Sequence, residues 1–205
     1  MSAAGQQREI VTAFLAEHGI ARLAELRAAG ATAATVSRME KVGEVVRLGR
    51  GLYQLPDAPL SADHSLATAA KRVPKGVVCL VSALAFHGLT DQLPRKVWLA
   101  VSKSDWARRH TAPELRIVQM ADRLLKADIE TRLIDGVTVK VFGVARTVAD
   151  CFRHRRTVGL NVAIEGLQEA LRQRKATPAE ISRHAEQGGV ATVMRPYLEA
   201  LTANA

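Results

Sequence analysis

Apolar residues recur at helical spacing over the first thirty positions, in two stretches that each end at a glycine. The first stripe consists of Ile10, Val11, Phe14 and Leu15. The second consists of Ala21, Leu23, Ala24 and Leu26. The first ends near His18-Gly19 and the second stops at Gly30, as expected where a glycine closes a helix. The pattern predicts two short amphipathic helices.

A third helix is predicted after Thr32, a residue type that caps helix N-termini. The apolar positions expected to face its core are Ala33, Val36, Met39 and Val42. The positions expected to face solvent are Thr35, Ser37, Arg38 and Lys41. This outward face is small, polar and basic.

Two β-prone runs follow this helix, Val45 to Leu48 and Leu52 to Leu55. Between them lies Gly49-Arg50-Gly51, in which either glycine can take a positive φ, so a hairpin with Arg50 at its tip is expected. Three helices and a hairpin, in this order, are typical of a winged helix-turn-helix, whose third helix reads base edges while the wing contacts phosphates or the minor groove. The candidate DNA contacts are Thr35, Ser37, Arg38, Lys41, Arg47 and Arg50. The alternative is that this unit mediates protein contacts only.

The Pro-containing segment 57–60 is interpreted as a linker between a winged-helix domain, 1–56, and a second domain, 61–205. Ser61 is expected to cap a helix that runs to about Arg72. A buried helix is predicted over Val77 to Leu89 and another over Gly143 to Phe152. The predicted strands are Val97 to Val101, Leu115 to Met120 and Val137 to Phe142, enough for a small sheet.

The last fifty residues have a helical pattern. Thr177-Pro178-Ala179-Glu180 forms a capping box with proline at the first helical position. Apolar stripes precede and follow it, at Leu160, Ile164, Leu167 and Leu171, and at Val190, Val193, Tyr197 and Leu201. The predicted fold class is α+β: an N-terminal winged helix-turn-helix, then a mixed α/β domain with a small sheet and C-terminal helices.

Charge favours a polyanionic partner. The chain has 205 residues and a formal net charge of +9. Residues 1–56 contain seven Arg or Lys against five acids, so most of the excess lies in the second domain. Nucleic acid is favoured over a membrane surface, because the sequence has neither a basic amphipathic anchor nor an apolar run long enough to span a bilayer. The N-terminal residues do not resemble a signal peptide, and a cytoplasmic protein is expected.

Catalytic and metal-binding motifs are not found. Cys79 and Cys151 lie in apolar surroundings without metal-type spacing and are expected to be buried thiols. The six histidines, His110 among them, include no H-x-x-x-H pair. There is no phosphate-cradling P-loop and no paired acids in a nuclease context. No enzymatic activity, no cofactor and no metal are therefore expected.

Three segments carry a resemblance to a known family: RLGRGLYQLP (47–56), VSALAFHGLTDQLP (81–94) and GVARTVADCF (143–152). In this order and spacing the chain resembles the AbiEi family of antitoxins of type IV toxin-antitoxin systems, which act in abortive infection, a phage defence. The resemblance implies an antitoxin that represses its own operon and counters a nucleotidyltransferase-like toxin. It also implies double-stranded operator DNA, an inverted repeat bound by two protomers. The chain has no heptad seam, so a monomer or weak dimer that pairs on DNA is expected.

Polar residues of the family-like motifs in the second domain are Ser82, His87, Arg146, Thr147 and Asp150. A structural role is preferred to a catalytic one, since Arg146 and Asp150 have the i, i+4 spacing of an ion pair and His87 can close a helix end. Further basic residues either extend the DNA path, meet an acidic toxin face or are simply solvated; they are Lys71, Arg72, Lys75, Arg153, Arg155, Arg156, Arg172, Arg174 and Lys175. The alternative function is an antidote that acts mainly by direct contact with the toxin, with DNA binding secondary.

Overall fold

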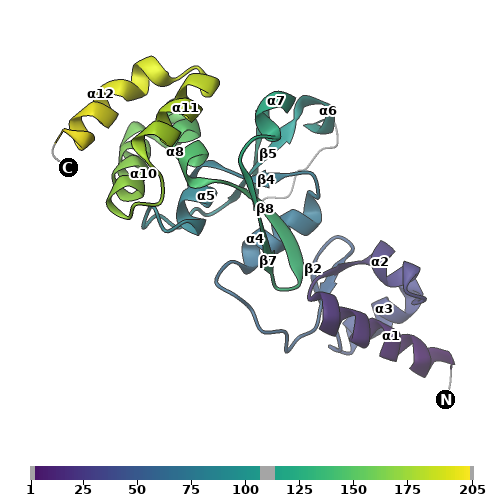
Figure 1. Ribbon diagram of the computed structural model, residues 1–205. Helices are drawn as coiled ribbons and strands as arrows, with labels where there is room; N and C mark the ends of the chain where they lie inside the picture. Colours follow the sequence, from purple (N-terminus) through teal and green to yellow (C-terminus); the bar gives the residue numbers. More distant parts are fainter. Residues whose placement is uncertain (1–2, 107–113, 204–205) are drawn as a thin grey trace. The chain divides into compact units, whose positions relative to one another are not determined.

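The computed structural model describes residues 3–106 and 114–203, and the chain divides into two compact units (Figure 1). The first unit contains Met1–Pro74 and Arg132–Val139. The second contains Lys75–Thr131 and Lys140–Ala205. The first unit thus extends past the predicted boundary at 57–60. The chain leaves this unit after Pro74 and returns to it once, at Arg132–Val139.

Three helices and a small sheet form the start of the first unit. The helices are α1 (Ala3–His18), α2 (Leu23–Ala28) and α3 (Ala33–Lys41). The strands are β1 (Ala21–Arg22), β2 (Val46–Gly49) and β3 (Leu52–Gln54), paired antiparallel in the order β1-β3-β2. Their core includes Val11, Leu15, Leu26, Val36 and Met39. This is the architecture of a winged helix-turn-helix.

Several local predictions for these helices are confirmed and others are wrong. Thr32 is the N-cap of α3, and its Oγ1 accepts a hydrogen bond from the Thr35 N–H at 3.2 Å. Ala33 and Val42 are exposed rather than in the core, because only the face through Val36 and Met39 is turned inward. Ala21, predicted to be helical, lies in β1 and pairs with Tyr53 of β3.

The first unit is completed by α4 (His64–Arg72) and by the turn at residues 135–136. Residues 57–60 form neither a helix nor a strand. Ser61 is not the cap of α4, a prediction that is wrong: the helix begins at His64, and the Ser61 N–H donates to Asp135 Oδ1 at 3.2 Å. This bond holds the segment after the wing against the turn.

Two glycines permit a close approach of α1 to this turn. Gly19, just after α1, has φ +66°, and Gly136 has φ +72°. A Cβ on Gly19 would collide with the backbone carbonyl of Asp135, and a Cβ on Gly136 would lie 2.5 Å from the carbonyl oxygen of His18. Both positions therefore require glycine for space as well as for conformation.

A five-stranded sheet lies at the centre of the remaining chain. Its strands are β4 (Val77–Val78), β5 (Val97–Ser102), β6 (Leu115–Met120), β7 (Ile129–Ile134) and β8 (Val137–Phe142), in the order β6-β5-β4-β8-β7. β5 is parallel to β6 and antiparallel to β4, which is parallel to β8. The mixed pattern confirms the small sheet that the strand-like runs predicted.

Two sequence-based predictions for this sheet need correction. Val77 to Leu89 is not one helix: β4 comes first, and α5 (Leu80–Phe86) follows a sharp turn at Leu80, which has φ +49°. Strand pairing on both sides of β4 decides the conformation of Val77 and Val78. β7 was not predicted at all, although the Asp135-Gly136 dipeptide after it is typical of a hairpin turn.

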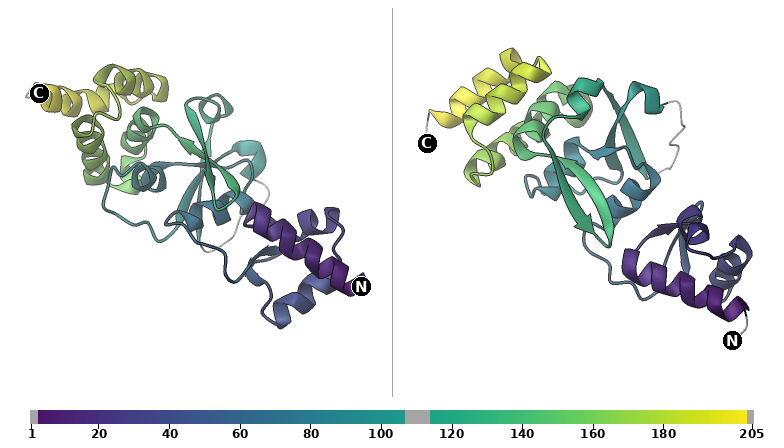
Figure 2. Two further views of the ribbon diagram at one scale, coloured as in Figure 1. Left: turned by 60° about the horizontal axis from the view of Figure 1, so that its bottom comes forward. Right: turned by 45° about the vertical axis from the view of Figure 1, so that its right-hand side comes forward.

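Helices cover the sheet and extend to the C-terminus. They are α6 (Lys103–Trp106), α7 (Asp122–Leu125), α8 (Val144–Arg153), α9 (Arg155–Val158), α10 (Leu160–Arg172), α11 (Pro178–Gly188) and α12 (Ala191–Thr202). The C-terminal helices α10, α11 and α12 gather around α8 (Figure 2), which contacts all three and also α5. α8 is buried from Ala145 to Phe152, and the predicted capping box at Thr177 is present. Within the described residues no helix has the length and apolar character needed to cross a membrane.

The predicted pair of Arg146 and Asp150 is confirmed, and it lies inside the second unit. Arg146 Nε donates to Asp150 Oδ2 at 2.6 Å, and both side chains are 3% exposed. Arg146 also donates to the Leu124 carbonyl at 3.0 Å, and its guanidinium lies over the Phe142 ring. Burial raises the pKa of Asp150 above its ordinary value, while the positive charge of Arg146 opposes this change. The pair thus fixes α8 against β8 and α7.

We expect Asp150→Ala to lower the free energy of unfolding by about 3–5 kcal/mol, because it leaves the Arg146 charge buried without a partner. Denaturant unfolding of the full chain measures this. The double variant Arg146→Met with Asp150→Leu should recover most of the loss, since neither charge then remains inside.

The exposed pair of Arg172 and Glu169 is a matched control on the surface of α10. Glu169→Ala should cause no comparable loss, because water replaces the lost partner. Equal losses at the two sites would contradict the structural role of the buried pair.

Candidate nucleic-acid interface

α3 and the hairpin present a polar and basic surface. On α3, Ser37, Arg38 and Lys41 are exposed, as the helical pattern predicted. On the wing, Arg47 and Arg50 are exposed. Helix and hairpin are adjacent in sequence and share one core, so five of the six predicted DNA contacts lie on the surface of one small domain.

Thr35 differs from these five, and the prediction that it faces solvent is wrong. Its side chain is 2% exposed, and its Oγ1 donates to Gln7 Oε1 on α1 at 2.5 Å. Thr32 Oγ1 donates to the same oxygen at 3.0 Å. Gln7 thus joins the N-terminus of α3 to α1, a role that sequence analysis missed. Its position four residues before Val11, in line with the apolar stripe of α1, was the available signal.

Arg38 is held along the surface of α3. Its Nε donates to the Ala34 carbonyl and a terminal nitrogen donates to Thr35 Oγ1, each at 3.3 Å. Thr35 therefore links Gln7 of α1 to the exposed guanidinium of Arg38. A side chain that is ordered before binding loses less conformational entropy when it contacts a base or a phosphate.

The wing arginines occupy different positions on the hairpin. Arg47 Nε donates to the Gly49 carbonyl at 3.1 Å, and its NH1 lies 3.8 Å from Glu40 Oε1. Arg50 lies in the turn between β2 and β3, where Gly51 has φ +67°. The predicted tip position of Arg50 is thus present, on a tight turn that glycine permits.

The basic end of α4 is attached to this domain. Lys71 Nζ lies 2.9 Å from Glu25 Oε1, and the Lys71 carbonyl accepts from the guanidinium of Arg22. Arg72 donates to the Leu48 carbonyl in the wing at 2.6 Å. Lys71 and Arg72 were predicted as further DNA or toxin contacts; the structure instead engages both inside the first unit. We call this set of bonds, formed by Arg22, Glu25, Leu48, Lys71 and Arg72, the α4 clamp.

Glu25 is the acidic member of the α4 clamp. Burial alone would raise the pKa of Glu25, but hydrogen bonds from the Arg22 N–H, at 2.6 Å, and from Lys71 outweigh burial and lower it. The carboxylate also belongs to the first turn of α2, where negative charge is favoured. The ionised form is therefore the stabilising one.

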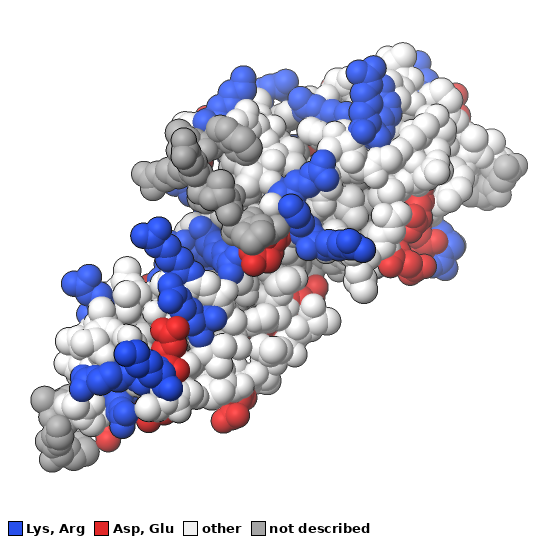
Figure 3. Space-filling view, turned by 180° about the vertical axis from the view of Figure 1, so that it is seen from behind, with Lys and Arg blue, Asp and Glu red and all other residues white. Residues whose placement is uncertain are grey.

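The other basic candidates lie in the second unit, and their roles as DNA or toxin contacts stay predictions. Arg153, Arg156 and Arg174 are exposed. The other four have partners within the same unit. Lys75 pairs with Asp105, and Arg172 pairs with Glu169. Arg155 donates to the Phe152 carbonyl, and Lys175 donates to the His87 carbonyl. Figure 3 shows Lys and Arg side chains exposed in one view of the molecule, with acids among them.

Two polar residues of the family-like motifs meet at the end of β8. The Phe142 carbonyl accepts from His87 Nε2 at 2.8 Å and from Thr147 Oγ1 at 3.1 Å. Ser82 Oγ accepts from the Trp98 N–H at 3.0 Å. With the buried pair of Arg146 and Asp150, these contacts support the structural role that was preferred for all five residues.

The described residues offer little for metal or thiol chemistry. Among them no group of three or more His, Cys, Asp or Glu side chains is arranged to hold a metal ion, and His110 lies outside them. Cys79 and Cys151 are buried and free, as predicted. Burial raises the pKa of both thiols well above the ordinary value, which disfavours the reactive thiolate.

The three helices, the antiparallel three-stranded sheet and the basic wing define a winged helix-turn-helix. Residues 8–56 match the family model described as "Transcriptional regulator, AbiEi antitoxin", a similarity that confirms the resemblance over this segment. No curated protein matches the chain.

One solved structure supports the fold beyond this segment. The crystal structure of the RV2827C protein from Mycobacterium tuberculosis is similar with a TM-score of 0.59 and 13% sequence identity, over 97% of this chain and 81% of that chain. At this identity the similarity shows the fold alone. The predicted α+β class is confirmed.

We expect Glu25→Gln to lower the free energy of unfolding at pH 7 by about 0.5–1 kcal/mol, a small value because Glu25 is 39% exposed. Since the folded pKa of Glu25 is lowered, its contribution is present above the unfolded pKa and is lost as pH falls through the folded pKa. The deficit of the variant should therefore shrink as the pH falls below the unfolded pKa of about 4.3 and vanish once the pH lies below the folded pKa. Denaturant titrations across this pH range test the expectation.

Glu9→Gln changes an exposed residue of α1 and is the matched control. Its free energy of unfolding should equal that of the unmodified chain at every pH. A Glu25→Gln deficit that persists in acid would show that packing, rather than charge, is lost.

Proposed function

We propose that this protein is an antitoxin and transcriptional autorepressor of a toxin-antitoxin operon. It binds operator DNA through α3 and the wing, and its second unit counters a nucleotidyltransferase-like toxin. Two observations on the same segment carry the proposal. Residues 8–56 match the regulator family, and the exposed residues of this segment on α3 and the wing include four Arg or Lys, Arg38, Lys41, Arg47 and Arg50.

Each part of the winged helix then has a distinct task. Arg38, with Ser37 and Lys41, faces base edges and phosphates in the major groove, where arginine pairs in bidentate fashion with guanine. Arg47 and Arg50 contact phosphates beside it or the minor groove. Thr35 acts indirectly, as the residue that positions Arg38 and fixes α3 to Gln7.

Two protomers on an inverted repeat would present two copies of α3 to successive major grooves, about 34–36 Å apart. Repression follows if this site overlaps the promoter of the operon. The protein needs no catalytic residue for this role, and the buried polar residues of the second unit serve its fold. We propose no enzymatic activity for it.

Binding to DNA from immediately upstream of its own gene is the decisive test. A mobility-shift titration of the full chain should show tighter binding to this fragment than to a shuffled fragment of the same length and composition. Equal binding to both would reject the repressor role and leave direct toxin contact as the leading function. Stoichiometric co-purification with the product of the neighbouring gene would support that alternative.

Arg38→Ala should weaken operator binding by about 1–3 kcal/mol and reduce the discrimination between operator and shuffled DNA if Arg38 reads a base. Mobility shifts with both fragments measure the two effects. Arg195→Ala, on the exposed side of α12, removes the same charge far along the chain and should change neither. An unaltered operator affinity for the Arg38 variant would refute its assignment.

Arg50→Ala should weaken binding to both fragments alike, because a wing contact to phosphate carries no sequence information. If Arg38 contacts phosphate as Lys41, Arg47 and Arg50 do, the four contacts predict a slope of log affinity against log salt of about −3.6 per protomer; if Arg38 reads a base, three contacts predict about −2.7. In either case loss of Arg50 should make the slope less steep by about 0.9. A steeper slope for the unmodified chain would show that the second unit also contacts DNA.

A further inference from the structure

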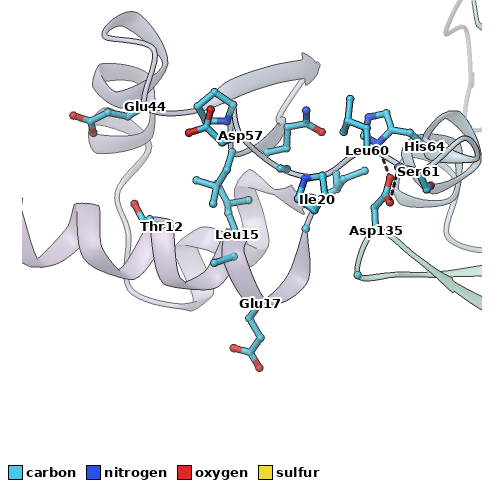
Figure 4. A pocket seen from close by; sticks show the side chains of 18 residues that line it. Thr12, Leu15, Glu17, Ile20, Glu44, Asp57, Leu60, Ser61, His64 and Asp135 are labelled. Atoms are coloured by element: carbon cyan, nitrogen blue, oxygen red, sulfur yellow. Dashed lines mark hydrogen bonds and ion pairs between the residues drawn. The ribbon is translucent and has the colours of Figure 1, made fainter.

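A cavity of about 910 Å³ lies within the first unit. Its wall is formed by the end of α1, the end of β3, the segment 55–61, the start of α4 and the turn at 135–136 (Figure 4). The volume is that of a site for a small organic molecule, which typically measures about 300–1,000 Å³. The roles described for α3, the wing and the buried polar residues make no use of this cavity.

Much of the cavity wall is apolar. Leu15 and Ile20 come from the end of α1 and the residues after it, and Leu55, Pro56 and Leu60 come from the segment that follows the wing. Leu60 is 59% exposed although it lines the cavity. An occupant with an apolar body would cover this surface and remove it from water.

One buried polar atom in the wall has no partner. Gln54, the last residue of β3, is 6% exposed, and its Oε1 makes no hydrogen bond. A buried acceptor left unsatisfied costs about 1–3 kcal/mol, so natural structures usually provide it with a donor. Gln54 lines the cavity, and a ligand N–H inside it is a donor of the required kind.

The polar side of the cavity lies at the start of α4. His64 Nδ1 is 2.8 Å from Asp135 Oδ2, and the Ser61 N–H donates to the other oxygen of Asp135, contacts visible in Figure 4. Burial alone would raise the pKa of Asp135, but the hydrogen bonds from His64 and Ser61 lower it, so this carboxylate is ionised. This side therefore carries an ionised carboxylate that is already held by two hydrogen bonds.

The charge of the wall is opposite to that of the chain. Four acids are among the lining residues, Glu17, Glu44, Asp57 and Asp135, and neither Lys nor Arg is. The carboxylates of Glu17 and Glu44 point away from the cavity in Figure 4, and Glu17 lies 3.9 Å from His18, so Asp57 and Asp135 are the acids that bear on an occupant. Arg8 lies 3.4 Å from Glu44, which offsets part of this charge. In a protein of net charge +9, such a wall attracts a cation and disfavours a carboxylate or phosphate.

We propose that this cavity is a binding site for a small amphipathic amine. The apolar body lies against Leu15, Ile20 and Leu55, an N–H donates to Gln54 Oε1, and the ammonium group lies on the side of Asp57 and Asp135. The site is separate from the proposed DNA contacts, so ligand binding can be tested in the absence of DNA.

Dansylcadaverine is a suitable probe, because it combines a fluorescent naphthalene body with an alkylammonium group. Titrated into the full chain, it should show saturable binding at one site. N-butyl dansylamide, which keeps the body but lacks the ammonium group, should bind at least about tenfold more weakly. If dansylcadaverine binds no better than this neutral analogue, the charge argument is rejected.

Gln54→Leu tests the buried acceptor at nearly constant side-chain shape. Because it replaces an unsatisfied polar group by an apolar one, the variant should fold and melt like the unmodified chain. Its affinity for dansylcadaverine should fall at least about tenfold. Gln119→Leu, the same change at an exposed position of β6, is the matched control and should bind the probe normally.

A second variant keeps the test informative if Gln54→Leu is poorly folded. Ala16 lines the cavity but is exposed on α1, so Ala16→Trp can place an indole in the cavity without disturbing the core. It should abolish probe binding. Undiminished binding by a folded Ala16→Trp or Gln54→Leu variant would show that the probe binds elsewhere, and the proposal would be withdrawn, whatever the outcome of the operator experiment.

Discussion

The α4 clamp joins the wing, α2 and α4 into one body. A lysine and an arginine at adjacent positions reach different elements: Lys71 Nζ meets Glu25 of α2, and Arg72 donates to a carbonyl of the wing. Each wing strand is only three or four residues long, and a two-stranded hairpin of this size has little stability of its own. The position of the proposed DNA-contacting hairpin therefore depends on a helix that follows it in sequence.

The same attachment gives the cavity its wall. Because α4 is fixed against the winged helix, the segment 55–61 is held at both ends, and Ser61 and His64 are brought to Asp135. The two glycines at 19 and 136 let the turn approach the end of α1 closely enough to close the other side. Lys71 and Arg72, which composition alone suggests for DNA, thus serve instead to assemble the first unit around its cavity.

Local patterns in the sequence predicted most elements of the fold and the surface of α3. The cap at Thr32, the capping box at Thr177 and the pair of Arg146 and Asp150 all depend on residues a few positions apart, which a sequence displays directly. Thr35 was misjudged because its burial depends on Gln7, distant in sequence. β1 and β4 were missed for the same reason, since two-residue strands exist only through pairing with distant partners.

The division of the first unit between two stretches of chain has a consequence for protein synthesis. Residues 3–74 leave the ribosome well before Arg132–Val139, so the winged helix emerges without the turn that holds Ser61 and His64. Domains generally fold as units during translation, N-terminal part first. Here the core of the winged helix is complete in residues 11–55, but the side of the cavity formed by residues 135–136 is made only after most of the central sheet, so the apolar wall of the cavity stays open to water until then.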